Sequence, residues 1–385
     1  MININSFKRE PESLKRKILI AAERVLESGS YILGREVANF ENRWAEANGT
    51  KHAIGVGNGM DALEISLRSI GVTAGDEVIT TPLTAFATAL AILRTGATPK
   101  FADINPRTGL LCINRVREAL TPRTKAIVLV HLYGHITAMD EWHALCEQNG
   151  LALVEDCAQA HLAKWSGRVA GSFGVAGAHS FYPTKNLGAL GDGGAIITND
   201  DKVNDDARTL RNYGQSVRYH HPEFGLNSRL DELQAAVLTE RLAYLKEFTN
   251  RRQDIATKYN VEITNAHVRI LAMPVARENH VYHLYVVCSP FRDALQRHLR
   301  ESGVESLIHY PIPVYKQPGL YKASLKLPGS AGASTLESVS QADLANEFRF
   351  CEEHTASCVT LPCHPFLSDA EVRVVIEAVN SFTPD

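Results

Sequence analysis

Two short stretches decide how this chain is interpreted: Leu151-Ala-Leu-Val-Glu-Asp156-Cys-Ala-Gln159-Ala-His161 and Ser180-Phe-Tyr-Pro-Thr-Lys185-Asn-Leu-Gly. In the first, Asp156 closes an apolar run that has the length of a buried strand. In the second, Lys185 follows another short apolar run and precedes a flexible, glycine-rich segment that ends at Gly194. Ligands of open α/β sheets bind beyond the carboxyl ends of the strands. We therefore expect Asp156 and Lys185 to face one ligand.

Strand-like and helix-like patterns alternate over a domain-sized part of the chain, which predicts a mostly parallel sheet with helices on both faces. The predicted strands are His52–Val56, Glu77–Thr80, Pro99–Ala102, Ala126–Val130, Leu151–Val154, Ala176–Ser180 and Ala195–Thr198. The predicted helices are 11–27, 35–47, Met60–Ile70, Phe86–Arg94, Arg115–Leu120 and Met139–Gln148.

The second half of the chain predicts a smaller α+β domain. A loop over 214–228 precedes a helix that apolar spacing predicts to be continuous from Leu230 to about Tyr259. We expect a large domain over 1–245 and a small domain over 246–385. Within the small domain, a strand (Val281–Val287), two helices (Phe291–Ser302 and Glu371–Val379) and a loop around Lys326–Ser334 are predicted.

Composition excludes several classes of protein. Of 385 residues, 45% are apolar and 22% are charged, and the net charge is −3, so neither nucleic acid nor an anionic membrane is an expected partner. Seven scattered cysteines without a Cys-x-x-Cys pair argue against disulfides and a zinc ribbon. His131 and His135 lack a third ligand, so no metal site is predicted. Without a signal peptide or an apolar span, the expected location is the cytoplasm.

Lys185 and Asp156 together indicate pyridoxal phosphate chemistry. A partly desolvated lysine amine can condense with the aldehyde of this cofactor, and an aspartate can keep its pyridine nitrogen protonated. Either residue alone has a simpler explanation, because most lysines lie on the surface and an aspartate after a strand often caps a helix. Glu155 should point to the opposite face of the strand from Asp156, so only one of the two acids can reach the cofactor.

The glycine-rich segment Gly55-Val-Gly-Asn-Gly59-Met60-Asp61-Ala62 joins the first strand to a helix, where free N–H groups can bind a phosphate. It also satisfies the loose dinucleotide pattern Gly-x-Gly-x-x-Ala. That pattern requires an acid at the end of the second strand, whereas Asp76 and Glu77 fall at its start. One monophosphate is therefore preferred, and a nicotinamide-dependent oxidoreductase remains an alternative.

Three further residues are weaker candidates from their position alone. Ser180 can donate a hydrogen bond to a phosphate, although a lone serine is usually a strand-end hydroxyl. Phe86 can stack on a planar ring, although a core aromatic is the commoner outcome. Ser228 is expected to cap the long helix, which explains the Asn227–Gln234 segment unless this loop reaches a second active site across a dimer interface.

These segments resemble the DegT/DnrJ/EryC1/StrS family of sugar aminotransferases in order along nearly the whole chain. The resemblance implies a fold-type I aminotransferase that works as a homodimer with shared active sites. It implies that Lys185 is the imine lysine and that Asp156 is the pyridinium partner. The other implied cofactor contacts are Gly59, Met60, Asp61, Phe86, Gln159, Ser180 and Asn227, the last from the partner subunit.

The resemblance also suggests a substrate. Family members that aminate the sugar C4 commonly carry His after the Ser-Phe of the lysine segment, whereas this chain has Tyr182, as in enzymes that aminate C3 of dTDP-3-keto-6-deoxyhexoses. L-glutamate is the expected amino donor, for amino-sugar and lipopolysaccharide or O-antigen biosynthesis. The candidate substrate contacts are Tyr182, Arg218, His220, His221, His309 and Tyr310.

Several alternatives stay open at this point. A UDP-linked 3-keto sugar or a 4-keto sugar could replace the dTDP-linked substrate. A family dehydratase would carry His in place of Lys185, and a non-catalytic binding protein should have lost Lys185 or Asp156.

Overall fold

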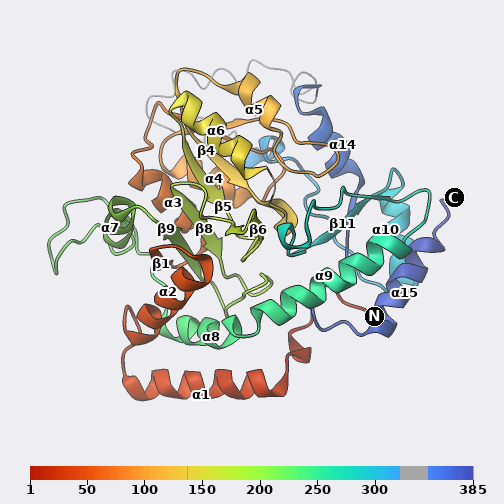
Figure 1. The fold of residues 1–385 in the computed structure, drawn as a ribbon, viewed down its shortest axis with the longest axis horizontal. Coiled ribbons are helices and arrows are strands. Elements are labelled where there is room, and N and C mark those ends of the chain that lie inside the picture. The colour runs from red at the N-terminus through yellow and green to blue at the C-terminus, as the bar shows by residue number, and fades with distance from the viewer. Residues whose placement is uncertain (137, 321–345, 385) are drawn as a thin grey trace.

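The computed structural model describes residues 1–136, 138–320 and 346–384. The loop predicted around Lys326–Ser334 lies outside these described residues. At the centre is a seven-stranded sheet in the order β1-β9-β8-β5-β4-β2-β3, and β9 is its single antiparallel member (Figure 1). This confirms the mostly parallel sheet. Its strands are β1 (His52–Val56), β2 (Glu77–Thr80), β3 (Thr98–Phe101), β4 (Thr124–Val130), β5 (Ala152–Asp156), β8 (Ala176–Ser180) and β9 (Gly194–Thr198).

Helices cover both faces of this sheet, because its buried strands carry apolar side chains on both sides. One face packs against α3 (Gly59–Ser69), α4 (Phe86–Arg94) and α7 (Asp201–Leu210). The other face packs against α2 (Arg35–Asn48), α5 (Ile113–Ala119), α6 (Met139–Asn149) and α8 (Glu232–Leu242). The N-terminal helix α1 (Glu12–Ser28) lies along α8 at the bottom of the view (Figure 1).

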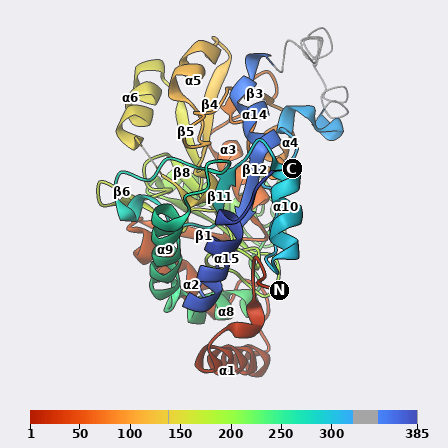
Figure 2. The same cartoon turned by 90° about the vertical axis from the view of Figure 1, so that its right-hand side faces the viewer.

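The C-terminal part forms a second, smaller unit of structure. Its antiparallel sheet consists of β10 (Arg269–Ile270), β11 (Tyr285–Cys288) and β12 (Cys358–Leu361). An apolar core joins this sheet to α9 (Leu245–Glu262), α10 (Arg292–Glu301) and α15 (Asp369–Asn380). The turned view shows these three helices around β11 and β12 (Figure 2). Further elements include α14 (Arg349–Ser357) and a hairpin of β6 (Lys164–Trp165) and β7 (Arg168–Val169). The domain boundary between 245 and 246 remains a prediction.

The single long helix expected from Leu230 to Tyr259 is wrong, because the structure has two helices that meet at Ala243-Tyr244. The apolar spacing continues through the break, so the pattern could not reveal it. The two halves pack against different partners: α8 lies on α1 and α2, whereas α9 joins the C-terminal core. The break between α8 and α9 therefore lets each helix pack against its own partners.

The expected cap at Ser228 is also wrong. The residue before α8 is Asp231, and the Ser228 hydroxyl instead accepts a hydrogen bond from the Gly57 amide at 3.0 Å. Ser228 thus ties the loop that precedes α8 to the glycine-rich segment after β1. This contact brings the 214–228 loop next to the predicted phosphate site.

Candidate active site

Asp156 lies at the carboxyl end of β5, as the sequence predicted. Its carboxylate accepts two hydrogen bonds, from the Thr88 hydroxyl at 2.9 Å and from the Ala158 amide at 3.1 Å. Burial raises the pKa of Asp156, and these two donors oppose that rise because they stabilise the anion. A cationic ring nitrogen is the kind of group that would complete this environment.

Lys185 lies in a turn after β8. Its backbone amide closes this turn by donating a hydrogen bond to the Tyr182 carbonyl at 2.8 Å. Burial lowers the pKa of Lys185, while the negative charge of Asp156 opposes this lowering. The charge of Lys185 in turn lowers the pKa of Asp156. Each charge therefore acts on the other, which agrees with the prediction that the two residues face one ligand.

Glu155 points to the other face of β5, as expected from the alternation of side chains along a strand. It is fully buried and contacts His131 Nε2 at 2.8 Å. The amides of Gly171, Phe173 and Gly174 also donate to its two oxygens. Cys157 lies close enough to complete a three-residue group with His131 and Glu155, but each carboxylate oxygen already receives two contacts from nitrogen atoms. Glu155 therefore holds His131 and the 171–174 backbone in place by hydrogen bonds.

The phosphate site predicted at the glycine-rich segment has the shape of a close-packed cradle. A Cβ atom on Gly59 would lie 2.6 Å from the Ser180 Cβ, so only glycine lets α3 begin this close to the end of β8. Asn58 caps α3 by accepting the Asp61 amide at 2.9 Å. Among the described residues, no acceptor contacts the amides of Gly59 and Met60. These two donors and the Ser180 hydroxyl fit a monophosphate.

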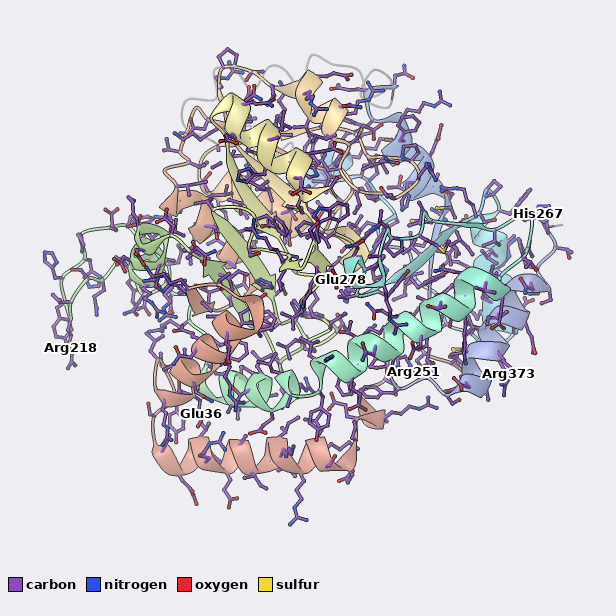
Figure 3. All side chains as sticks on the ribbon, viewed as in Figure 1. Glu36, Arg218, Arg251, His267, Glu278 and Arg373 are labelled. Atoms are coloured by element: carbon purple, nitrogen blue, oxygen red, sulfur yellow. The ribbon has the colours of Figure 1, made fainter. Side chains whose placement is uncertain are left out.

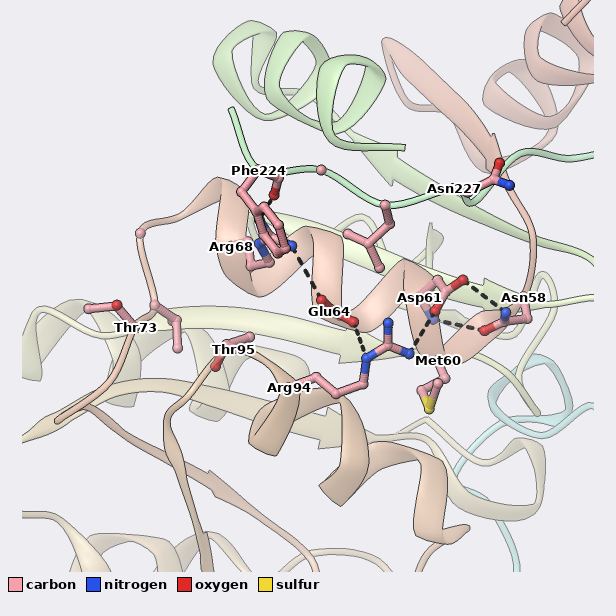
Figure 4. Close-up of a pocket in the computed structure, with 14 residues that line it drawn as sticks. Asn58, Met60, Asp61, Glu64, Arg68, Thr73, Arg94, Thr95, Phe224 and Asn227 are labelled. Carbon is pink, nitrogen blue, oxygen red and sulfur yellow. Dashed lines mark hydrogen bonds and ion pairs between the residues drawn. The ribbon is translucent and has the colours of Figure 1, made fainter. Parts of the chain in front are cut away.

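The Asp61 carboxylate is held by residues of its own chain, and its predicted contact with the cofactor remains a prediction. It accepts from the Asn58 side chain at 3.0 Å and pairs with Arg94 at 3.3 Å (Figure 4). These contacts line a cleft of about 930 Å³ between α3, α4 and the loop that ends at Asn227. The exposed Asn227 side chain reaches this cleft from its own chain. A contribution of Asn227 to a partner's site remains a prediction.

Gln159, His309 and Tyr310 come together beside Asp156. The Gln159 amide donates to the Tyr310 hydroxyl at 3.1 Å and accepts the Tyr133 amide at 2.6 Å. The Tyr133 hydroxyl donates to the His309 carbonyl at 2.6 Å. Burial, together with the Asp156 charge, raises the pKa of Tyr310 to about 12. A predicted cofactor contact and two predicted substrate contacts therefore form one hydrogen-bonded group.

The other predicted substrate contacts are not joined to this group within one chain. Arg218, His220 and His221 lie on an exposed loop that projects from the left edge, where Figure 3 labels Arg218. Tyr182 is 52% exposed beside the lysine turn. Phe86 begins α4 and is half-buried, two residues before the Thr88 that bonds Asp156.

Sequence reasoning missed Thr88 and Tyr133. Thr88 is 68 residues from Asp156, and its hydroxyl is one of many on predicted helices, so no local signal marks it. Tyr133 lies in the Val130-His-Leu-Tyr-Gly134 segment, where Gly134 adopts a positive φ of 97°. That glycine marks a sharp turn after a strand, which was the one available hint.

The structure does not supply the acid that a dinucleotide-binding site would require at the end of the second strand. Glu77 begins β2, at the edge of the sheet opposite to Asp156, as the sequence indicated. Its carboxylate binds Arg123 and accepts the Thr121 hydroxyl at 2.6 Å. An acid held in this way is not available to a ribose at the other edge. Separately, none of the described helices combines the length and apolar content needed to cross a membrane.

Comparison with known proteins gives a consistent result over the whole chain. The model of the DegT/DnrJ/EryC1/StrS aminotransferase family matches residues 12–380. A dTDP-3-amino-3,6-dideoxy-alpha-D-galactopyranose transaminase of Aneurinibacillus thermoaerophilus is 41% identical, over 96% of each chain. A UDP-2-acetamido-2-deoxy-3-oxo-D-glucuronate aminotransferase of Pseudomonas aeruginosa is 37% identical, over 99% of this chain and all of that protein.

A solved structure agrees. DesV of Streptomyces venezuelae matches with a TM-score of 0.87 and 38% identity, over 99% of this chain and 97% of that one. The lysine, the aspartate and the phosphate cradle described above have the chemistry that such enzymes require. The chain therefore belongs to the DegT/DnrJ/EryC1/StrS family and is a pyridoxal phosphate-dependent sugar aminotransferase.

Proposed function

We propose that this enzyme transfers the amino group of L-glutamate to the 3-keto carbon of a dTDP-linked 3-keto-6-deoxyhexose. The observation that carries the proposal is that Asp156 ends β5 at the carboxyl edge of the sheet and that the charges of Asp156 and Lys185 act on each other's pKa. Pyridoxal phosphate supplies an electron sink and a carrier for the amino group. The protein's task is then to bind, orient and move protons.

Each residue has a role that follows from its environment. Lys185 is the general base and acid that moves a proton between the donor α-carbon and C4′, and burial favours its neutral form. Thr88 and Ala158 stabilise the anionic form of Asp156, which would pair with the protonated ring nitrogen. The amides of Gly59 and Met60 hold the phosphate.

The choice of sugar rests on the relatives and on Tyr182. A dTDP-linked 3-amino sugar is named for one relative, and a UDP-linked 3-oxo sugar is named for another. Both names place the amino group or the ketone at C3, which agrees with Tyr182 in the position where C4-specific members commonly carry histidine. The dTDP-linked sugar is the first choice, and the UDP-linked sugar is the alternative.

A spectroscopic titration tests the reaction class. Purified holoenzyme should show a visible band that L-glutamate removes and that 2-oxoglutarate restores. A colourless protein that binds NAD would refute the proposal. Lys185→Ala should keep the fold but fail to complete turnover, and normal turnover would refute its role as acid and base.

A substrate panel then tests the sugar. The pyridoxamine form should be offered dTDP-3-keto-6-deoxy-glucose, its galactose epimer, a UDP-linked 3-keto sugar and a 4-keto sugar. Return of the visible band with a dTDP-linked 3-keto sugar alone supports the first choice. Return with the 4-keto sugar alone contradicts the inference from Tyr182.

The proposal includes a cytoplasmic homodimer with shared active sites, in a pathway toward surface polysaccharide. Its support is that Arg218, His220 and His221 lie on an exposed loop, which projects from the edge of the molecule where Figure 3 labels Arg218. Mixing inactive Lys185→Ala with inactive Asn227→Asp tests the sharing. Mixed dimers should regain activity, because one of their two sites receives both native residues. No recovery, with mixed dimers demonstrated, would refute shared sites.

A further inference from the structure

The imidazole ring of His161 is buried against the segment that carries Lys185. His161 is 1% exposed, and its Nδ1 accepts a hydrogen bond from the Leu187 amide at 3.1 Å. A ring nitrogen that accepts a hydrogen bond carries no proton, so the proton of the neutral ring is on Nε2. His161 thus offers a hydrogen-bond acceptor to the backbone two residues after the reacting amine.

This hydrogen bond reaches the middle of a closed loop, residues 181–189, which we call the lysine loop. The Ala189 amide closes the lysine loop by donating to the Phe181 carbonyl at 2.7 Å. Among the described residues, the Leu187 amide is the one backbone amide of this loop that donates to a side chain from another part of the chain. The position of the loop interior therefore depends on where the His161 ring lies.

His161 and Asp156 belong to one short segment after β5. This segment is tied to the neighbouring strand β8, because the Cys157 amide donates to the Ala178 carbonyl at 2.8 Å. Asp156 stands at its start, where its predicted partner is the ring nitrogen of the cofactor, and His161 stands five residues later. The same segment thus carries one cofactor contact directly and holds the loop that carries the other.

The His161 ring is held in place by three other rings. The centroids of Trp44, His179 and Phe181 each lie 5.1–5.6 Å from a neighbouring ring of this group, and all three lie 5.6 Å from that of His161. A ring enclosed in this way cannot turn without displacing buried side chains. Burial lowers the pKa of His161 to about 3, and the charge of Lys185 adds to this lowering. The ring is therefore neutral at working pH, and its acceptor is always available.

We propose that His161 is a positioning residue for Lys185, because through the Leu187 amide it holds the lysine loop in a fixed place relative to Asp156. It touches the backbone of the loop rather than the reacting atoms. Proton transfer depends on this placement, since a displacement of about 1 Å can slow a reaction about a hundredfold. The inference rests on the proposed transamination and adds to it the residue that places its proton carrier.

The native protein gives a first test without any substitution. Nitrogen-15 NMR of histidine-labelled apoenzyme reports which ring nitrogen carries the proton. A His161 ring that stays neutral, with its proton on Nε2, supports the proposal. A proton on Nδ1, or a ring that titrates near neutral pH, overturns it. This measurement also decides the matter if the variants below do not fold.

A matched pair of variants tests the hydrogen bond itself. His161→Phe keeps a ring but removes the acceptor, so hydrogen exchange at the Leu187 amide should accelerate about tenfold to a hundredfold in the apoenzyme. The control is His179→Phe, because His179 is fully buried in the same group of rings and neither of its nitrogens bonds to the described residues. It should leave the exchange unchanged. His161→Asn, which places an oxygen near the Nδ1 position, should restore much of the protection.

Two functional readouts separate positioning from a general loss of stability. Burial lowers the pKa of Lys185, so a loosened loop in His161→Phe should move the acylation midpoint of this amine to higher pH. The charge of Asp156, which opposes that lowering, is the same in all variants. The rate at which L-glutamate removes the visible band should fall about tenfold to a hundredfold. Affinity for pyridoxamine phosphate, which needs no bond to the lysine, should stay near the native value.

Three results would overturn the positioning role: a native acylation midpoint in His161→Phe, an equal loss of pyridoxamine phosphate affinity, or the same effects in His179→Phe. Failure of this inference is distinguishable from failure of the proposed function. A native holoenzyme whose visible band does not respond to L-glutamate refutes the proposed function. A native band that responds, combined with native behaviour of His161→Phe, refutes only the role of His161.

Discussion

The Thr88 hydroxyl offers the sharpest test of how the site stabilises the anionic form of Asp156. It donates one of the two hydrogen bonds that the buried carboxylate accepts, at 2.9 Å. Thr88→Val removes the donor and preserves the shape of the side chain. A hydrogen bond to a charged group contributes about 1.5–3 kcal/mol. Since 1.36 kcal/mol corresponds to one pKa unit, the pKa of Asp156 should rise by about one to two units.

The assay is a titration of the apoenzyme with pyridoxal phosphate at a series of pH values, followed by its visible band. Protonation of Asp156 removes the partner of the ring nitrogen, so cofactor affinity should fall on the acid side. The midpoint of this fall should lie about one to two pH units higher in Thr88→Val.

Thr80→Val is the matched control for that titration, because the buried Thr80 hydroxyl donates to the Val128 carbonyl at 2.9 Å and does not touch Asp156. Coincident midpoints in Thr88→Val and the native enzyme would refute the reasoning. An equal shift in Thr80→Val would refute it as well.

Two further predictions concern the phosphate cradle and the amine. Gly59→Ala places a Cβ atom 2.6 Å from the Ser180 Cβ. This substitution should lower the free energy of unfolding by about 1–3 kcal/mol and weaken cofactor binding. The control is Gly191→Ala, whose nearest atom is the end of a flexible side chain at 3.4 Å, and it should have neither effect. The Asp156 charge raises the pKa of Lys185, so Asp156→Asn should let Lys185 react with an acylating reagent at lower pH. Mass spectrometry of the apoenzyme would measure the pH midpoint of this acylation. An unchanged or higher midpoint would contradict the shared site.

The sequence predicted those elements best whose signal is local. The bounds of β1, β2, β8 and α4 agree residue for residue with the prediction, because each is a short apolar run between polar or turn residues. The polar helix α7 was not predicted, since its segment Asp201–Leu210 carries few apolar residues. The break between α8 and α9 depends on what each half packs against, which periodicity does not contain.

The same division applies to the site. Lys185 and Asp156 could be located because Asp156 ends one recognisable apolar run and Lys185 follows another. The contacts of Thr88 with Asp156 and of Tyr133 with His309 join residues 68 and 176 positions apart, so only the folded chain shows them. Long-range hydrogen bonds thus set the electrostatics of residues that local patterns can merely locate.

The glycine-rich run after Lys185 shows how a local pattern can be interpreted in the wrong physical terms. The glycine content of this run predicts flexibility, yet its last residue is buried and packed. Because β9 is antiparallel to its neighbours, its first residue, Gly194, lies at the edge where the parallel strands end. A Cβ atom there would lie 2.5 Å from the Asn58 carbonyl carbon, immediately before α3. The glycine permits a close approach that fixes the start of α3, so the amides of Gly59 and Met60 are pre-organised for a phosphate before it binds.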